Sequence, residues 1–120
     1  MTQPKVLVAE DYDDARDVMS MVLQSAGFQV IEARDGQEAL DAALTLRPSV
    51  IVMDMFMPNM DGLAATRALR DEPTLRHIPV IAQTAQPSAV SGSRELFDAV
   101  LAKPCSPDIL IRTICEVLGR

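Results

Sequence analysis

Short apolar runs alternate with amphipathic stretches along the whole chain. The apolar runs predict five strands, at residues 6–9, 28–33, 50–53, 79–83 and 99–102. Between them, apolar residues recur at the i, i+3, i+4 spacing of an amphipathic helix. This spacing predicts helices over 13–26 and 107–118, from Asp35-Gly36 to Arg47-Pro48, and from Asp61-Gly62 to Glu72-Pro73. The run 50–53 is continuously apolar, which is typical of a strand covered by helices on both faces.

The regular alternation of strands and helices predicts an α/β fold. Such an order favours a parallel sheet with right-handed crossovers and helices on both faces. We therefore expect a doubly wound, five-stranded parallel sheet of flavodoxin-like order 2-1-3-4-5, formed by residues 1–120 as a single domain. The helix expected over 87–96 contains Ser91-Gly92-Ser93 at its centre. Because glycine is a poor helix former, this helix is predicted to be short or irregular.

Composition narrows the functional classes. A chain of 120 residues fits one domain, and its apolar runs are too short to span a bilayer. The chain carries 17 acidic against 11 basic residues, a net charge of −6, which disfavours direct binding of nucleic acid. Cys105 and Cys115 have neither CxxC spacing nor clustered histidines, so a zinc site is unsupported. No signal segment precedes the first strand, and a cytoplasmic location is expected.

Chemically active side chains follow four of the predicted strands. Glu10-Asp11 and Asp54 end the first and third, and Thr84 and Lys103 end the fourth and fifth. In a 2-1-3-4-5 sheet these ends converge at one edge, where open α/β proteins bind ligands. Each close pair of carboxylates would repel by up to about 4 kcal/mol at an effective dielectric near 20. A divalent cation relieves this repulsion, and oxygen ligands of this kind suit Mg²⁺.

The other two side chains suit a phosphoryl group. A hydroxyl from Thr84 and an ammonium from Lys103 would bracket the metal-bound acids and contact phosphoryl oxygens. Asp54 would then be the nucleophile, since carboxylates accept phosphoryl groups as acyl phosphates.

Together these residues resemble the receiver domain of two-component response regulators. The motifs match in order over nearly the whole chain; they are Glu10-Asp11, Asp54, the run Met57-Pro58-Asn59-Met60-Asp61-Gly62, Thr84-Ala85 and Lys103-Pro104. The resemblance implies Mg²⁺ held by Glu10, Asp11, Asp54 and the backbone carbonyl of Phe56. It implies phosphoryl transfer to Asp54 from a phosphohistidine of a sensor histidine kinase or histidine phosphotransfer protein, with Thr84 and Lys103 on the phosphoryl oxygens. It also implies a cis Lys103-Pro104 bond.

The same resemblance implies a signalling role rather than an enzymatic one. Such a chain would catalyse only its own phosphorylation and dephosphorylation, and would signal through protein contacts to a downstream target that the sequence does not name. The chain would be either a stand-alone receiver, which is the expectation here, or a receiver excised from a larger kinase or regulator.

Two features depart from the family pattern. Receivers usually carry an aromatic residue three positions before the lysine, where this chain has Val100, and the nearest aromatic is Phe97. The stretch from Thr84 to Lys103 is also roughly three residues shorter than usual. Both changes affect the surface formed by 87–96, 99–102 and 107–118. The hypothesis is that phosphorylation is retained while the usual threonine and aromatic switch is not.

Other functions fit the sequence less well. A degenerate receiver serving as a phosphorylation-independent docking module remains the main alternative. An aspartyl-phosphate phosphatase of the haloacid-dehalogenase type would need a second acid two residues after Asp54, where Phe56 stands. A flavodoxin-like nucleotide binder would need backbone donors in its first loop, whereas the run Glu10-Asp11-Tyr12-Asp13-Asp14 repels phosphate.

Overall fold

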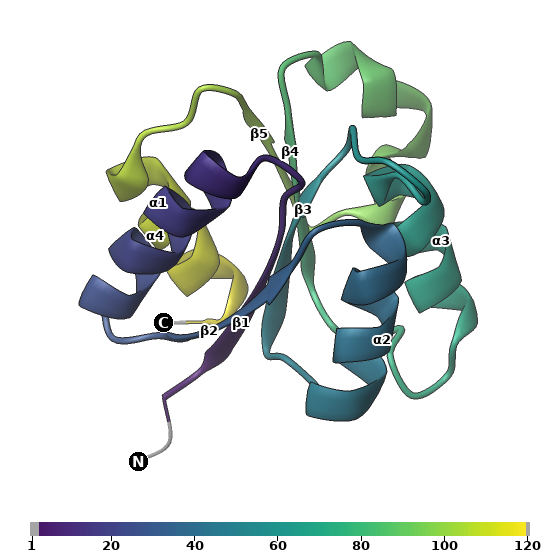
Figure 1. Cartoon of the computed structure of the whole chain (residues 1–120). Coiled ribbons are helices and arrows are strands. Elements are labelled where there is room, and N and C mark those ends of the chain that lie inside the picture. Colours follow the sequence, from purple (N-terminus) through teal and green to yellow (C-terminus); the bar gives the residue numbers. More distant parts are fainter. Residues whose placement is uncertain (1–2, 120) are drawn as a thin grey trace.

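The computed structural model describes residues 3–119, and its centre is a five-stranded parallel sheet (Figure 1). The strand order is β2-β1-β3-β4-β5, and all pairs are parallel, as the sequence predicts. The strands are β1 (Lys5–Ala9), β2 (Gln29–Ala33), β3 (Val50–Asp54), β4 (Val80–Thr84) and β5 (Ala99–Ala102). Every residue of β3 and β4 is buried, because helices cover both faces of the sheet.

Four α-helices cover the two faces of the sheet. One face carries α1 (Asp13–Ser25) and α4 (Pro107–Val117), and the other carries α2 (Gly36–Leu46) and α3 (Gly62–Asp71) (Figure 1). Two apolar clusters correspond to the two faces. Leu23 of α1 and Ile114 of α4 pack with Val52 on the first face, and Ala43 of α2 and Leu69 of α3 pack with Ile51 on the second. None of the helices between residues 3 and 119 is long and apolar enough to cross a membrane.

The segment η1 (Pro87–Leu96) is a 3₁₀ helix interrupted at Ser93, whose φ and ψ are −134° and 22°. This confirms the prediction of an irregular helix between β4 and β5. Side chains of α3 hold the segment in place: Arg67 donates to Ser93 Oγ at 2.9 Å, and Arg70 donates to the Leu96 carbonyl at 2.7 Å. Tertiary hydrogen bonds from arginines therefore support a segment that lacks a continuous α-helical ladder.

Several predicted boundaries are wrong by one residue. The third and fourth strands were expected to end at residues 53 and 83, but β3 extends to Asp54 and β4 to Thr84. The reason is that Asp54 still pairs with Gln83, and Thr84 with Ala102. Two of the site residues are consequently the last residues of strands rather than the first residues of loops.

Candidate functional site

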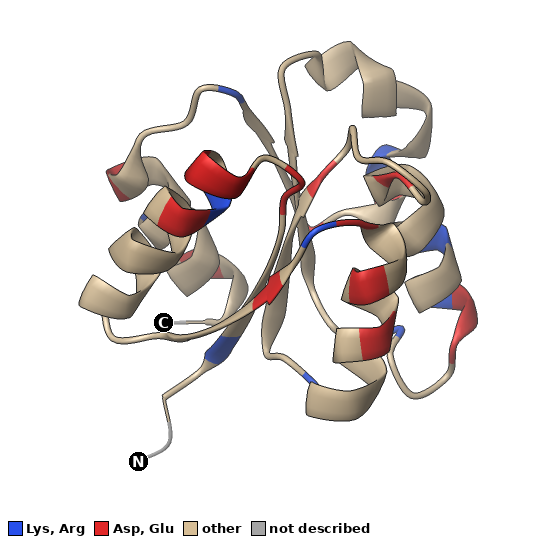
Figure 2. Cartoon of the chain, in the orientation of Figure 1, with Lys and Arg blue, Asp and Glu red and all other residues tan. Residues whose placement is uncertain are grey.

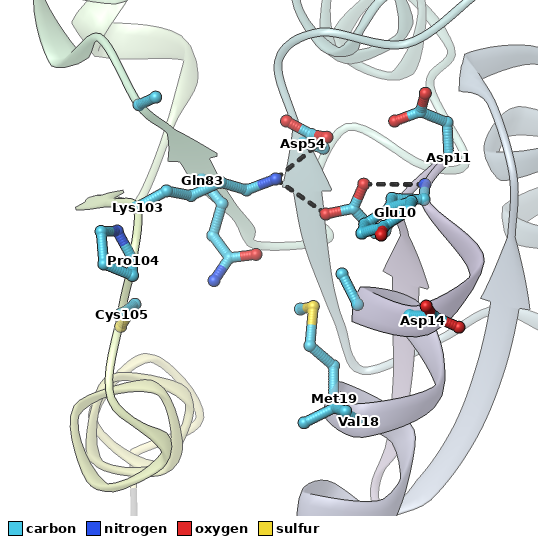
Figure 3. A pocket seen from close by; sticks show the side chains of 13 residues that line it. Glu10, Asp11, Asp14, Val18, Met19, Asp54, Gln83, Lys103, Pro104 and Cys105 are labelled. Atoms are coloured by element: carbon cyan, nitrogen blue, oxygen red, sulfur yellow. Dashed lines mark hydrogen bonds and ion pairs between the residues drawn. The ribbon is translucent and has the colours of Figure 1, made fainter.

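The site lies at the carboxyl edge of the sheet, on the face covered by α1 and α4. Side chains alternate between the two faces along a strand. Glu10 follows Val8, Asp54 follows Val52 and Gln83 follows Ile81, each two residues beyond a member of the cluster under α1 and α4. These side chains border a cavity of about 780 Å³ that also reaches Lys103 and the start of α1 (Figure 3).

Three carboxylates meet at the edge of this cavity. Oxygen atoms of Glu10, Asp11 and Asp54 lie within 4.8 Å of one another. Glu10 and Asp54 are 2% and 5% exposed, whereas Asp11 is open to solvent. Further acidic residues gather at the start of α1 (Figure 2). A cluster with only oxygen donors and one accessible member suits a hard divalent cation that keeps some of its water.

Lys103 balances part of this negative charge. Its Nζ lies 2.7 Å from Glu10 Oε1 and 3.1 Å from Asp54 Oδ2 (Figure 3). The side chain crosses from the end of β5 to the ends of β1 and β3, over 93 residues of sequence separation from Glu10. The Lys103–Pro104 peptide bond is cis, as the resemblance implies.

The pKa values of the two buried carboxylates, Glu10 and Asp54, are shifted in opposite directions. Burial, together with the hydrogen bond and repulsion from Glu10, raises the pKa of Asp54 from 3.8 to about 6, although Lys103 opposes the shift. Burial also acts to raise the pKa of Glu10, but hydrogen bonds from Lys103 and the Tyr12 N–H outweigh it, and that pKa is lowered. When two carboxylates share a site, repulsion between their charges raises the pKa of one of them. Burial lowers the pKa of Lys103, but the bonds to Glu10 and Asp54 prevail and raise it.

Arg16 of α1 holds the acidic loop 10–13 in place through a hydrogen bond and an ion pair. The Arg16 side chain is almost fully buried, and its Nη1 donates to the Glu10 carbonyl at 2.8 Å. The same guanidinium pairs with Asp13, and Tyr12 N–H donates to Glu10 Oε2 at 3.1 Å. The sequence shows Arg16 only as an i, i+3 partner of Asp13 on a helix, so its bond to the Glu10 backbone was missed.

The loop after Asp54 is fastened to the start of α2. Gly36 N–H donates to the Met60 carbonyl at 2.8 Å, and Asn59 Nδ2 donates to Asp35 Oδ2 at 2.8 Å. A Cβ on Gly36 would lie 2.3 Å from the Met60 oxygen, so the close approach requires glycine. Phe56 N–H donates to Asp54 Oδ1 at 3.3 Å. The loop that would supply the Phe56 carbonyl to a metal is thus held at both of its ends.

Thr84 lies at the same edge of the sheet but does not line the cavity. Its Oγ1 accepts a hydrogen bond from Gln86 N–H at 3.0 Å and donates to the Gln86 carbonyl at 3.2 Å. The structure therefore brings Glu10, Asp11, Asp54 and Lys103 together, and places the Thr84 hydroxyl against its own chain.

Val100 and the nearest aromatic residue, Phe97, also lie away from the cavity. Val100 is half-buried and packs against the cluster under α2 and α3, and Phe97 is 5% exposed at the end of η1. Neither side chain borders the cavity.

We expect amide spectra of the protein with Mg²⁺ and beryllofluoride to lack large two-state shifts centred on residues 97–102. The reason is that a ligand shifts an equilibrium only as far as it binds two states differently, and Val100 offers little to distinguish them. The measurement is a paired comparison of spectra with and without beryllofluoride. Large two-state shifts centred on these residues would show that the chain switches in the usual way.

The chain belongs to the response regulator receiver domain family, whose model matches residues 6–115. It is a member of the receiver class of two-component signalling modules, which act in signalling rather than as conventional enzymes.

Among curated relatives, the polar-differentiation response regulator DivK of Brucella anthropi is 38% identical over 119 residues, covering 95% of both chains. The chemotaxis response regulator CheY4 of Vibrio cholerae has a similar structure, with a TM-score of 0.90 and 33% identity over 97% of this chain and 99% of that one. The receiver domain of a sensor histidine kinase from Pseudomonas aeruginosa PAO1, solved with a magnesium ion in its active-site cleft, has a TM-score of 0.86 and 31% identity over 99% and 100%.

Proposed function

We propose that residues 1–120 form a single receiver domain that accepts a phosphoryl group on Asp54. The observation that supports this most strongly is the placement of Asp54. It is the last residue of a fully buried strand, and the Lys103 ammonium lies against both its carboxylate and that of Glu10. The donor would be a phosphohistidine of a sensor histidine kinase or of a histidine phosphotransfer protein, and signalling would follow through protein contacts.

In the proposed reaction an Asp54 carboxylate oxygen attacks phosphorus. The new bond joins Asp54 Oδ to phosphorus, the phosphorus–nitrogen bond of phosphohistidine breaks, and the imidazole leaves with its electron pair and takes up a proton. The Lys103 ammonium starts 3.1 Å from Asp54 and lies close enough to neutralise phosphoryl charge. Thr84 would contact a phosphoryl oxygen after its hydroxyl leaves Gln86.

The acid cluster fits Mg²⁺. Glu10, Asp11 and Asp54 offer oxygens within 4.8 Å of one another, and the Phe56 carbonyl belongs to the adjoining loop. We assign these four residues to the metal site. When bound, the ion would offset the charge that the phosphoryl group adds to this acidic edge. The bound magnesium of the Pseudomonas receiver supports this assignment by similarity.

Intact mass measurement tests the proposal. After incubation with Mg²⁺ and acetyl phosphate, we expect the mass to increase by one phosphoryl group. The increase is expected to be absent in Asp54→Asn, which lacks the nucleophile, and in a sample treated with EDTA. If a folded protein gains no mass with acetyl phosphate, a phosphorylated histidine phosphotransfer protein is the second donor, and no adduct from either would favour the docking-module alternative.

A further inference from the structure

Gln83 is a polar residue at the site that has no role in the proposed reaction. It is paired in register with Asp54 on the neighbouring strand, and the two side chains project from the same face of the sheet. Side chains so placed on adjacent strands are neighbours, about 5 Å apart at their origins. Gln83 also borders the cavity that contains Glu10, Asp54 and Lys103.

The side-chain amide of Gln83 has no partner in the described part of the chain and is open to the cavity. The residue is 6% exposed, and its side-chain amide forms no hydrogen bond within residues 3–119. Every fully sealed side-chain nitrogen or oxygen among these residues does have a partner, so the Gln83 amide atoms open into the cavity. Figure 3 shows the amide directed into this space beneath the Lys103 side chain. An amide with no partner in the protein can donate to or accept from another polar group that lines the same cavity.

Lys103 is the group beside Gln83 that must change partners. Leu101 pairs in register with Gln83, and Lys103 follows two residues later toward the same edge. Its ammonium has three hydrogens; it donates to Glu10 Oε1 at 2.7 Å and forms an ion pair with Asp54 Oδ2 at 3.1 Å. If Asp54 became an acyl phosphate and Glu10 helped to hold Mg²⁺, as proposed above, the ammonium would lose carboxylate acceptors although its side chain is only 30% exposed.

We propose that Gln83 is a positioning residue whose amide oxygen accepts a hydrogen from Lys103 when the ammonium moves from the carboxylates to the phosphoryl group. This inference rests on the proposed function. A neutral amide suits the task because it supplies an acceptor without adding negative charge beside the incoming phosphoryl oxygens. A glutamate here would compete with the phosphoryl group for Lys103 and repel it, and an apolar side chain would leave the ammonium with one acceptor fewer.

The chain contains only two lysines, Lys5 and Lys103, which makes the proposal directly measurable. Lysine labelled with ¹⁵N at Nζ gives one signal from the site and one from Lys5 at the start of β1, an internal control. We expect Mg²⁺ with beryllofluoride to move the Lys103 signal in the wild type. In Gln83→Met, which keeps the length and loses the amide, that signal is expected at a different position while the Lys5 signal is unchanged.

Phosphorylation by acetyl phosphate provides the second readout. Gln83→Met is expected to react roughly tenfold more slowly, the size of one hydrogen bond to a charged group. Because Gln83 acts through Lys103, the same substitution in a Lys103→Met background is expected to cause no further loss. Ile81→Val is the matched control, because Ile81 lies on the same face of β4 two residues before Gln83 and does not line the cavity. This substitution is expected to leave the Lys103 signal and the phosphorylation rate unchanged.

Three results would overturn the inference: an identical Lys103 signal in Gln83→Met with beryllofluoride, a rate loss that adds fully to that of Lys103→Met, or a Lys103 signal that beryllofluoride does not move in the wild type. Failure of the proposed function is seen separately, as absence of the mass adduct in the wild type. The beryllofluoride measurement requires no phosphoryl transfer, so the two outcomes are distinguishable.

Discussion

At pH 7.5 the Asp54→Asn variant is expected to have a higher free energy of unfolding than the parent chain, by on the order of 2 kcal/mol. The parent ionises Asp54 against burial and against Glu10, which together raise its pKa from 3.8 to about 6. A shift of this size corresponds to roughly 3 kcal/mol, and part of the gain is lost because Lys103 keeps one carboxylate acceptor instead of two. The asparagine side chain has the same shape and carries no charge.

The same shift fixes the pH dependence. A raised pKa means that the folded state binds the Asp54 proton more tightly than the unfolded chain does. Stability therefore falls as pH rises from about 4 to about 6, and the full penalty persists above that range. Glu10, whose pKa is lowered, stabilises the fold when ionised and loses this effect only below its ordinary value of 4.5. Between about pH 4.5 and 6 the slope comes from Asp54, and Asp54→Asn is expected to remove it.

Urea unfolding at a series of pH values measures both effects. Glu10→Gln is the contrasting variant and is expected to destabilise the protein at pH 7.5, because it replaces the carboxylate that Lys103 and the Tyr12 N–H stabilise. Two results would contradict a raised pKa at Asp54. One is an Asp54→Asn variant that is less stable than the parent, and the other is a parent whose free energy of unfolding does not change between pH 4.5 and 6.

Gly62→Ala is expected to destabilise the protein by about 2 kcal/mol and to slow the proposed phosphorylation of Asp54. A Cβ at this position would lie 2.1 Å from the Asp54 carbonyl oxygen and 2.9 Å from its carbonyl carbon. Alanine improves helix propensity by about 1 kcal/mol over glycine, but overpacking against backbone costs about 1–3 kcal/mol and sometimes more. The steric term prevails here because the nearest atom, the Asp54 carbonyl oxygen, belongs to the backbone and cannot rotate away.

Gly92→Ala is the matched control for this substitution. No atom lies within 4 Å of a Cβ built on Gly92, and the residue sits in η1. The same chemical change is therefore expected to be neutral or slightly stabilising there. Thermal unfolding of both variants, with their rates of adduct formation, checks the prediction. Equal behaviour of the two variants would show that the close contact at Gly62 relaxes without cost.

The periodic apolar pattern predicts the fold because it determines which faces are buried. Continuous apolar runs favour helices on both sides, and alternation with helices favours parallel strands. The order 2-1-3-4-5 is predicted by analogy with the flavodoxin-like fold and the irregular η1 from Ser91-Gly92-Ser93, and the structure confirms both. The convergence of Glu10, Asp11, Asp54 and Lys103 follows from that order, since strand ends of a parallel sheet share an edge.

Other features depend on side-chain geometry that no short motif encodes. Arg16 reaches the Glu10 carbonyl only because α1 turns back along β1. The unpaired amide of Gln83 becomes visible only once its register with Asp54 is known. The orientation of the Thr84 hydroxyl depends on the turn at Gln86. Strand ends shift by one residue because backbone pairing continues past the last apolar residue.

The alternation of side chains along the strands places the acidic site and Val100 on opposite sides of the sheet. Glu10, Asp54 and Lys103 belong to the α1 and α4 side, whereas Val100 packs with the residues of α2, α3 and η1. Thr84 follows Ala82 on that second side, yet stands at the edge where both sides meet. If the proposed function holds, sequence change in η1 or at Val100 would alter the surface offered to a partner, while the acids on the opposite side of the sheet keep their geometry.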